Sequence, residues 1–392
     1  MSFFDNHYYY LNKIFLRIIG QWPFQSRLES NLTFVAASLS ILTLGALESW
    51  GLVAGISNLS IIMDNAAPLL VISIVNIKLY NCVFTRNKMK MLLEDIEETW
   101  KMKRSEPEKK ILQHYAEESK DFTIRYAIAL YAAWLFYCGT PLVITWIDKL
   151  LPKHTNETYT ARFLYRIEHV LDMDKYYNLL MLHAFIGVFY LLSVLIAIDS
   201  IFTVCIQHIC ALFECIRYNI EQTRTLDTVL LQPNIENDEA YRNLIGCIKS
   251  YKHVLKLSHV LSSNYAVSFL FLLGNVVISL SFGWAQFIIV DTQLDEKIRI
   301  LFGNMTQLLH IYGLCSISQR LINHSCEFQG VIYSCNWYRM SLRSRHFLRF
   351  TLLRSMKPCE LKAGKVFVMS MEIFSSILKV CLSYITMLTS LQ

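Results

Sequence analysis

Residues 366–392 read VFVMSMEIFSSILKVCLSYITMLTSLQ and form the last long apolar stretch of the chain. A helix of about 20 apolar residues spans the roughly 30 Å hydrocarbon core of a bilayer. This stretch exceeds that length, and its charged residues are Glu372 and Lys379. The sequence therefore predicts that the chain crosses a membrane here.

Six more stretches upstream have the length and apolar composition of membrane-spanning helices. They comprise residues 31–54, 62–85, 123–147, 177–206, 260–290 and 298–322. Of the 392 residues, 54% are hydrophobic and 17% are charged, whereas a soluble domain has about 25% charged residues. We therefore predict an all-α membrane protein with seven transmembrane helices. Its polar residues Asn76, Lys78 and Asp199 should face neighbouring helices rather than lipid.

The positive charges divide unequally between the two sides of the predicted membrane. Alternate segments between the spans hold 27 and seven of the Lys and Arg residues, and the more positive side is the cytoplasmic one. The N-terminus is therefore predicted to be cytoplasmic and the C-terminus extracellular, the reverse of a G-protein-coupled receptor. Asn58 and Asn156 begin sequons in loops that this topology makes extracellular, so both are candidate glycosylation sites. All 11 cysteines lie in spans or cytoplasmic loops, so no external disulfide framework is expected.

The charged loop between the second and third spans carries a helical stripe of apolar residues. Met89, Leu93 and Ile96 recur at helical spacing, and Pro107 interrupts the pattern. The two spans are therefore expected to continue as cytosolic helices with a turn near Pro107. The basic segment 335–359 can pack in the same cytosolic bundle or bind anionic lipid headgroups.

Two short patterns near the end of the chain resemble the seventh helix of insect odorant receptors. They are Phe374-Ser-Ser and the pair Ser383-Tyr384. The preceding segment RSMKPCELKAGKVF (354–367) and the segment QHICALFECIRYNI (207–220), after the fourth span, are also similar to that family. The resemblance implies a ligand-gated, non-selective cation channel. In such a channel four subunits form a tetramer, and each contributes its seventh helix to a central pore.

The family includes an obligate coreceptor with a long cytoplasmic insertion after the fourth span. This chain has no such insertion, so it resembles a ligand-selective tuning subunit. Its implied partners are the coreceptor, a small volatile odorant and the lipid membrane, with no nucleic acid and no cofactor. The implied location is the plasma membrane, in the dendrite of an olfactory neuron.

The resemblance divides the chain into four regions. They are a cytoplasmic amphipathic segment (1–30), helices one to four with a ligand pocket in their outer half (31–213), helices five and six with cytosolic anchor helices (214–365), and the pore-lining seventh helix (366–392).

The resemblance also implies that the end of the seventh helix lines and closes the pore. It places an apolar gate at Met387 and Leu391. Tyr384 lies one turn earlier at helical spacing, and Ser390 and Gln392 are polar neighbours of the gate. Rings of apolar side chains close a pore by excluding water. The alternative is that this terminal turn faces lipid or neighbouring helices.

The family's ligand pocket lies between the second, third, fourth and sixth helices, in the outer half of the membrane. A pocket of this kind is apolar with few polar groups, which suits small volatile esters, alcohols, ketones or hydrocarbons. The candidate residues are Leu70, Ile74, Trp134, Tyr137, Thr140, Met181, His183, Phe185, Tyr190, Met305, Leu308 and Tyr312. His183 is expected to donate one hydrogen bond. For each residue the alternative is ordinary helix packing.

Other classes of membrane protein fit the sequence less well. A G-protein-coupled receptor needs the opposite topology, and a gustatory receptor, which shares the architecture, usually has a different pattern in its seventh helix. A membrane enzyme needs paired acidic or histidine motifs, which the predicted spans lack. His208 with Cys210, and His324 with Cys326, come nearest to a metal-binding spacing. Neither has a second pair, so no metal site is predicted.

Overall fold

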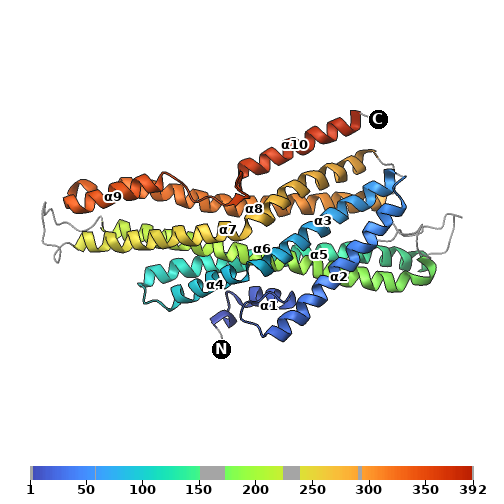
Figure 1. The fold of residues 1–392 in the computed structure, drawn as a ribbon, viewed down its shortest axis with the longest axis horizontal. Coiled ribbons are helices and arrows are strands. Elements are labelled where there is room, and N and C mark those ends of the chain that lie inside the picture. The colour runs from blue at the N-terminus through green and yellow to red at the C-terminus, as the bar shows by residue number, and fades with distance from the viewer. Residues whose placement is uncertain (1–2, 58, 151–172, 224–238, 290–293, 391–392) are drawn as a thin grey trace.

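The computed structural model describes residues 3–57, 59–150, 173–223, 239–289 and 294–390 of the chain, almost all of them helical. The elements are η1 (Phe3–Asp5), α1 (Tyr10–Ile18), α2 (Arg27–Ala54), α3 (Leu59–Phe84), α4 (Arg86–Lys101), α5 (Glu106–Leu150), α6 (Met173–Thr223), α7 (Glu239–Ile289), α8 (Leu294–Ser334), η3 (Trp337–Arg339), α9 (Leu342–Ser355), β1 (Lys362–Ala363), β2 (Phe367–Val368) and α10 (Met371–Ser390). They form one elongated bundle (Figure 1).

Several helices are much longer than a membrane is thick. Helices α6 and α7 have 51 residues each, which at a rise of 1.5 Å per residue makes each about 76 Å long. A hydrocarbon core of roughly 30 Å covers less than half of that length. The remainder packs with α4 and α9 in a second layer beyond the membrane part, as Figure 1 shows at the end opposite the α2–α3 turn. The helices therefore continue past the predicted spans, as expected for the loop between the second and third spans.

Five helices in the described part of the chain are long and apolar enough to cross a membrane: α2, α3, α6, α7 and α8. The predicted spans in α5 and α10 fall partly on residues whose side chains are outside that description. In Figure 1 the α2–α3 turn and the far end of α10 lie toward one end of the bundle. The turn between α4 and α5 lies toward the other end, which agrees with the alternation of sides that the charge pattern predicts.

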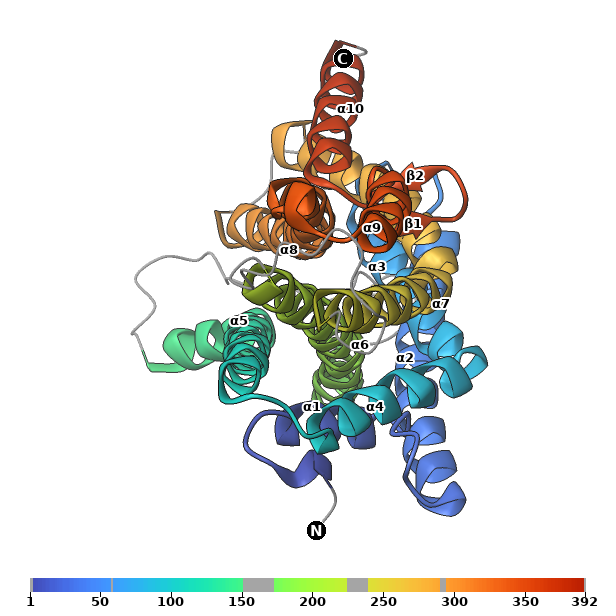
Figure 2. The ribbon, with the colours of Figure 1, turned by 90° about the vertical axis from the view of Figure 1, so that its left-hand side faces the viewer.

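Helix α6 forms the centre of the bundle. Every side chain from Ser193 to Phe213 is buried, and a helix that is buried on all sides must be surrounded by other elements. Figure 2, which looks along the bundle, shows α6 enclosed by α5, α7, α8 and the N-terminal helices. Helix α10 lies outside this arrangement. It packs on α7 and α8 through buried residues such as Ile377 and Cys381.

The seventh predicted span begins later than residue 366. A small antiparallel hairpin of β1 and β2 pairs Lys362 with Val368 and precedes α10, which begins at Met371. Gly364 makes the turn at a φ of 63°, a conformation that glycine adopts without strain. Its backbone N–H donates to the Ala266 carbonyl at 2.7 Å, which anchors the hairpin to α7. The apolar run at 366–370 is therefore partly strand and turn.

Candidate functional site

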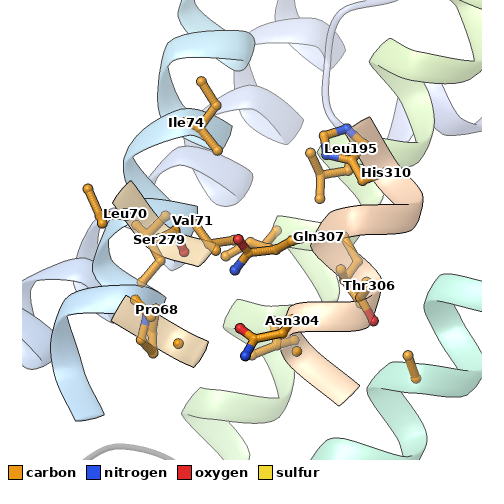
Figure 3. A pocket seen from close by; sticks show the side chains of 18 of the residues that line it. Pro68, Leu70, Val71, Ile74, Leu195, Ser279, Asn304, Thr306, Gln307 and His310 are labelled. Atoms are coloured by element: carbon orange, nitrogen blue, oxygen red, sulfur yellow. The ribbon is translucent and has the colours of Figure 1, made fainter. Parts of the chain in front are cut away.

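A cavity of about 320 Å³ lies between α3, α5, α6, α7 and α8, with α2 at one side. Its walls are mostly aliphatic, and Figure 3 shows side chains from several helices facing one space. The apolar lining includes Leu44, Leu70, Val71, Ile72, Ile74, Leu130, Trp134, Val188, Leu191, Leu192, Leu195, Leu272 and Val276. An enclosed, largely apolar space with few polar groups is the usual form of a small-molecule site.

Polar residues line both ends of the cavity, and Gln307 lies between those ends (Figure 3). His310 and Asn304 both line it from α8, and Figure 3 shows them about two turns apart on that helix. Asn304 lies nearer the start of α8, close to the α2–α3 end of the bundle, where Glu48 and Asp64 also line the cavity. His310 lies nearer the second layer, which is formed with α4 and α9, together with Tyr126. We call these the outer and the inner polar end.

The inner polar end is a fully connected cluster around Asp199. Lys78 Nζ donates to Asp199 Oδ1 at 2.6 Å, and His310 Nε2 lies 2.8 Å from Oδ2. The Tyr126 hydroxyl also donates to Oδ2, at 3.1 Å. The Lys78 and Asp199 side chains are only 1% and 3% exposed. Buried charges at membrane depth are stable when they are paired, so this cluster ties α3, α5, α6 and α8 together.

The sequence predicted that Lys78 and Asp199 face protein, and their burial against neighbouring helices confirms it. The partnership itself was not predicted. The sequence did contain a signal for it, because a lysine in the second span and an aspartate in the fourth are expected to form an ion pair in an apolar environment.

The structure brings three of the predicted pocket residues into the cavity wall: Leu70, Ile74 and Trp134. The lining does not include Met181, His183, Phe185, Tyr190, Met305, Leu308 or Tyr312. The side chains of Tyr137 and Thr140 lie outside the described residues. His183 Nε2 is 2.9 Å from Thr43 Oγ1, at the contact between α6 and α2. The Phe185 ring packs against Trp134, with ring centroids 4.2 Å apart.

Helical phase explains which residues reach the cavity from α8. Gly303, Thr306, Gln307 and His310 line it, and their spacing of three and four residues marks one helix face. Met305 and Tyr312 lie on other faces and are exposed. The polar residues at this spacing were the signal for the cavity face, because a lipid-facing side would be apolar.

Helix α10 exposes the predicted pore residues that the structure describes. Tyr384 and Met387 are 47% and 49% exposed, and Ser390 is exposed while its hydroxyl donates to the Met387 carbonyl at 2.8 Å. Leu391 and Gln392 lie outside the described residues, as do the sequon residues Asn58 and Asn156. Helix α10 also contacts α7, where the Cys381 thiol lies 3.8 Å from the Val277 carbonyl oxygen.

A further cluster of ionisable residues lies in the second layer, around Asp95. The Asp95 carboxylate of α4 accepts from His253 of α7 at 2.8 Å, and His208 Nε2 of α6 lies 3.5 Å from its other oxygen. Burial alone would favour a neutral Asp95, but its contacts with the two histidines lower its pKa to about 2. The hydrogen bond with Asp95 in turn raises the pKa of His253 above its usual value. Among the described residues, no group of three His, Cys, Asp or Glu side chains could hold a metal ion.

Comparison with known proteins identifies the family. The family model described as 7tm Odorant receptor matches residues 58–382, which is most of the chain. The chain belongs to this family. The match confirms the resemblance found in the sequence, and it favours the odorant receptor interpretation over the gustatory receptor and the G-protein-coupled receptor.

Individual odorant receptors are similar to this chain over shorter stretches. The odorant receptor coreceptor of Aedes aegypti is 23% identical over 145 residues, which are 37% of this chain and 30% of the coreceptor. Odorant receptor 2a of Drosophila melanogaster is 25% identical over 158 residues, 38% of each chain. The alignments thus span well under half the length of these relatives.

The fold is similar to that of a solved odorant receptor over nearly its whole length. The structure of the insect olfactory receptor OR5 from Machilis hrabei in complex with eugenol has a TM-score of 0.80 at 15% identity, and it covers 99% of this chain and 100% of that one. The structure of the same receptor described without eugenol has a TM-score of 0.82. This chain therefore has the odorant receptor fold.

Proposed function

We propose that the chain is the ligand-selective subunit of an odorant-gated, non-selective cation channel. A small volatile ligand binds in the cavity between α3 and α5–α8, and its binding opens a pore lined by α10 from each of four subunits. The observation that carries the proposal is the 320 Å³ cavity with mostly aliphatic walls, which lies between the long helices of a chain of the odorant receptor family.

Two kinds of similar protein support the proposed ligand and the proposed partner. The solved OR5 receptor, which has the same fold, is described in complex with eugenol, a small aromatic molecule. Several relatives of this chain are odorant receptor coreceptors. We therefore assign a small odorant as the ligand and the coreceptor as the partner in a heterotetramer. The protein is then multi-pass in the plasma membrane, with a cytoplasmic N-terminus and an extracellular C-terminus.

Helix α7 supplies a direct mechanical link between cavity and pore. Leu272, Val276 and Ser279 line the cavity from one face of α7. Val277 directly follows Val276, and its carbonyl oxygen is in contact with Cys381 of α10. A ligand that binds more tightly when α7 is displaced shifts the equilibrium toward that state, and α10 moves with it. In this account Tyr384, Met387 and Ser390 face the pore, and the adjoining Leu391 and Gln392 complete the gate.

The test is to record whole-cell current during application of a panel of volatile compounds, with and without the coreceptor. We expect a ligand-evoked cation current that requires both chains. A current from this chain alone would indicate a homomeric channel, and an absence of evoked current despite surface expression of both chains would contradict the proposed function.

A further inference from the structure

The outer polar end of the cavity differs from the rest of its wall in charge. Two carboxylates line it there, Glu48 from α2 and Asp64 from α3, and they lie close enough for their charges to interact. Among the described residues that line the cavity there is no lysine or arginine. The outer end therefore holds two acidic side chains, and the described wall supplies no lysine or arginine beside them.

Glu48 is the group that most needs a partner. It is only 3% exposed, and its Oε2 atom is fully buried and has no hydrogen-bond partner in the described part of the chain. Two lining residues carry further atoms that are buried without partners in the same way, Ser279 Oγ and Asn304 Nδ2. Asp64 differs, because its Oδ1 accepts a hydrogen bond from Gln286.

An isolated carboxylate is strongly disfavoured in an apolar interior. The inner polar end meets this requirement with protein groups, since Lys78 and His310 both bind Asp199. No such group faces Glu48 among the described residues, and the nearby charge of Asp64 makes a second negative charge still less favourable. A cation inside the cavity would compensate the Glu48 carboxylate.

We propose that the cavity binds a protonated organic amine, whose ammonium group donates hydrogen bonds to the Glu48 carboxylate. Asp64 adds its negative charge, and the Ser279 hydroxyl accepts another ammonium hydrogen. The aliphatic wall formed by residues such as Leu70, Ile74 and Leu195 holds the hydrocarbon part of the amine. This inference rests on the proposed function, because it names the ligand class of the same cavity.

The first experiment compares matched ligands on the wild-type channel. Straight-chain primary amines and the alcohols of equal length, from butyl to octyl, are applied to cells that express this chain with the coreceptor. A charge-assisted hydrogen bond in a buried site should make the best amine at least about tenfold more potent than its matched alcohol. Alcohols that activate as well as or better than the amines would overturn the amine assignment, since a neutral Glu48 would then serve neutral ligands.

The second experiment removes the charge at one position. Glu48→Gln should lower amine potency about tenfold or more while it changes alcohol potency less than about threefold. Glu29→Gln is the matched control, because Glu29 lies on the same helix but is exposed and paired with Arg17; it should keep the wild-type ratio of amine to alcohol potency. An unchanged ratio in Glu48→Gln would overturn the proposal. If that variant does not reach the cell surface, the wild-type comparison decides.

The two proposals fail in different ways. A channel that responds to alcohols but to none of the amines keeps the proposed function and refutes the amine site. A complex of chain and coreceptor that reaches the surface and responds to neither series, but does respond to another compound of the volatile panel, also keeps the function and refutes the amine site. A complex that responds to no compound at all refutes both.

Discussion

Each polar end of the cavity contains a buried acidic residue, but the two residues differ in how many hydrogen-bond partners they have. At the inner end Asp199 has three protein partners, Lys78, His310 and Tyr126. At the outer end Glu48 has a buried carboxylate oxygen without a hydrogen-bond partner in the described chain. Completed polar networks rigidify a protein, whereas an incomplete one is costly unless a ligand completes it. We therefore expect the inner end to stabilise the fold and the outer end to bind the ligand.

Removing a partner from the cluster at the inner end should cause the largest loss of stability. Lys78→Met removes the cation from a pair that is almost completely buried, and the loss of one partner from such a pair costs about 3–5 kcal/mol. We expect a large fall in the unfolding temperature in detergent and little protein at the cell surface. Lys90→Met is the control, because Lys90 forms an exposed ion pair with Glu94. Equal stability of the two variants would show that the inner cluster is not structural.

Filling the cavity with a larger side chain should reduce ligand potency more than it reduces the stability of the fold. Leu195→Phe adds volume to the cavity wall beside His310 (Figure 3), and overpacking of this kind costs about 1–3 kcal/mol. We expect the potency of amines and neutral ligands to fall together, by roughly tenfold to a hundredfold. Leu182→Phe, at an exposed position on the same helix, should leave potency unchanged. Dose–response curves of evoked current measure both, and equal behaviour of the two variants would place the ligand elsewhere.

A smaller change at the outer end tests its geometry. A methyl group at Gly283 would collide with the Asn304 amide, whereas one at Gly274 on the same helix meets no atom within 4 Å. Gly283→Ala should therefore displace Asn304 and change ligand potency about tenfold or less, an effect of roughly 1 kcal/mol. Gly274→Ala should behave as wild type. If the two variants have the same dose–response curve, Asn304 does not contribute to the site.

Changing the cluster around Asp95, in which His253 is the most exposed member, should have the smallest effect on stability, and the effect should depend on pH. His253 has a raised pKa in the folded protein, so its contribution to stability is complete below its unfolded pKa of about 6.5 and disappears as pH rises through the folded value. Asp95→Asn should remove this contribution. We expect the loss of thermal stability in detergent to be greater at about pH 6 than at about pH 8.5. A loss that is independent of pH would contradict the assigned pairing.

Much of the fold followed from the sequence because each span is a long apolar run. The burial of Lys78 and Asp199 followed from the cost of charge in a membrane. The start of α10 was wrong by five residues, because the hairpin before it depends on contacts with α7 that are distant in sequence. Gly364 makes the turn of this hairpin, and its N–H donates to the Ala266 carbonyl of α7.

The cavity face was harder to predict, for a physical reason. Helix α6 is buried on all sides between Ser193 and Phe213, so no apolar stripe distinguishes Leu195 from its neighbours. Helix α8 carried a usable pattern in Gly303, Thr306, Gln307 and His310. Glu48, the single acidic residue in the first predicted span, was also a signal, since an ionisable residue at membrane depth is a functional candidate by default.

The most direct test is a density map of this chain assembled with the coreceptor and bound to an activating ligand. We expect ligand density inside the cavity, in contact with Leu70, Trp134 and Leu195, with the polar atom of the ligand directed toward Glu48. Ligand density at another place, with this cavity empty while the channel is open, would contradict this expectation.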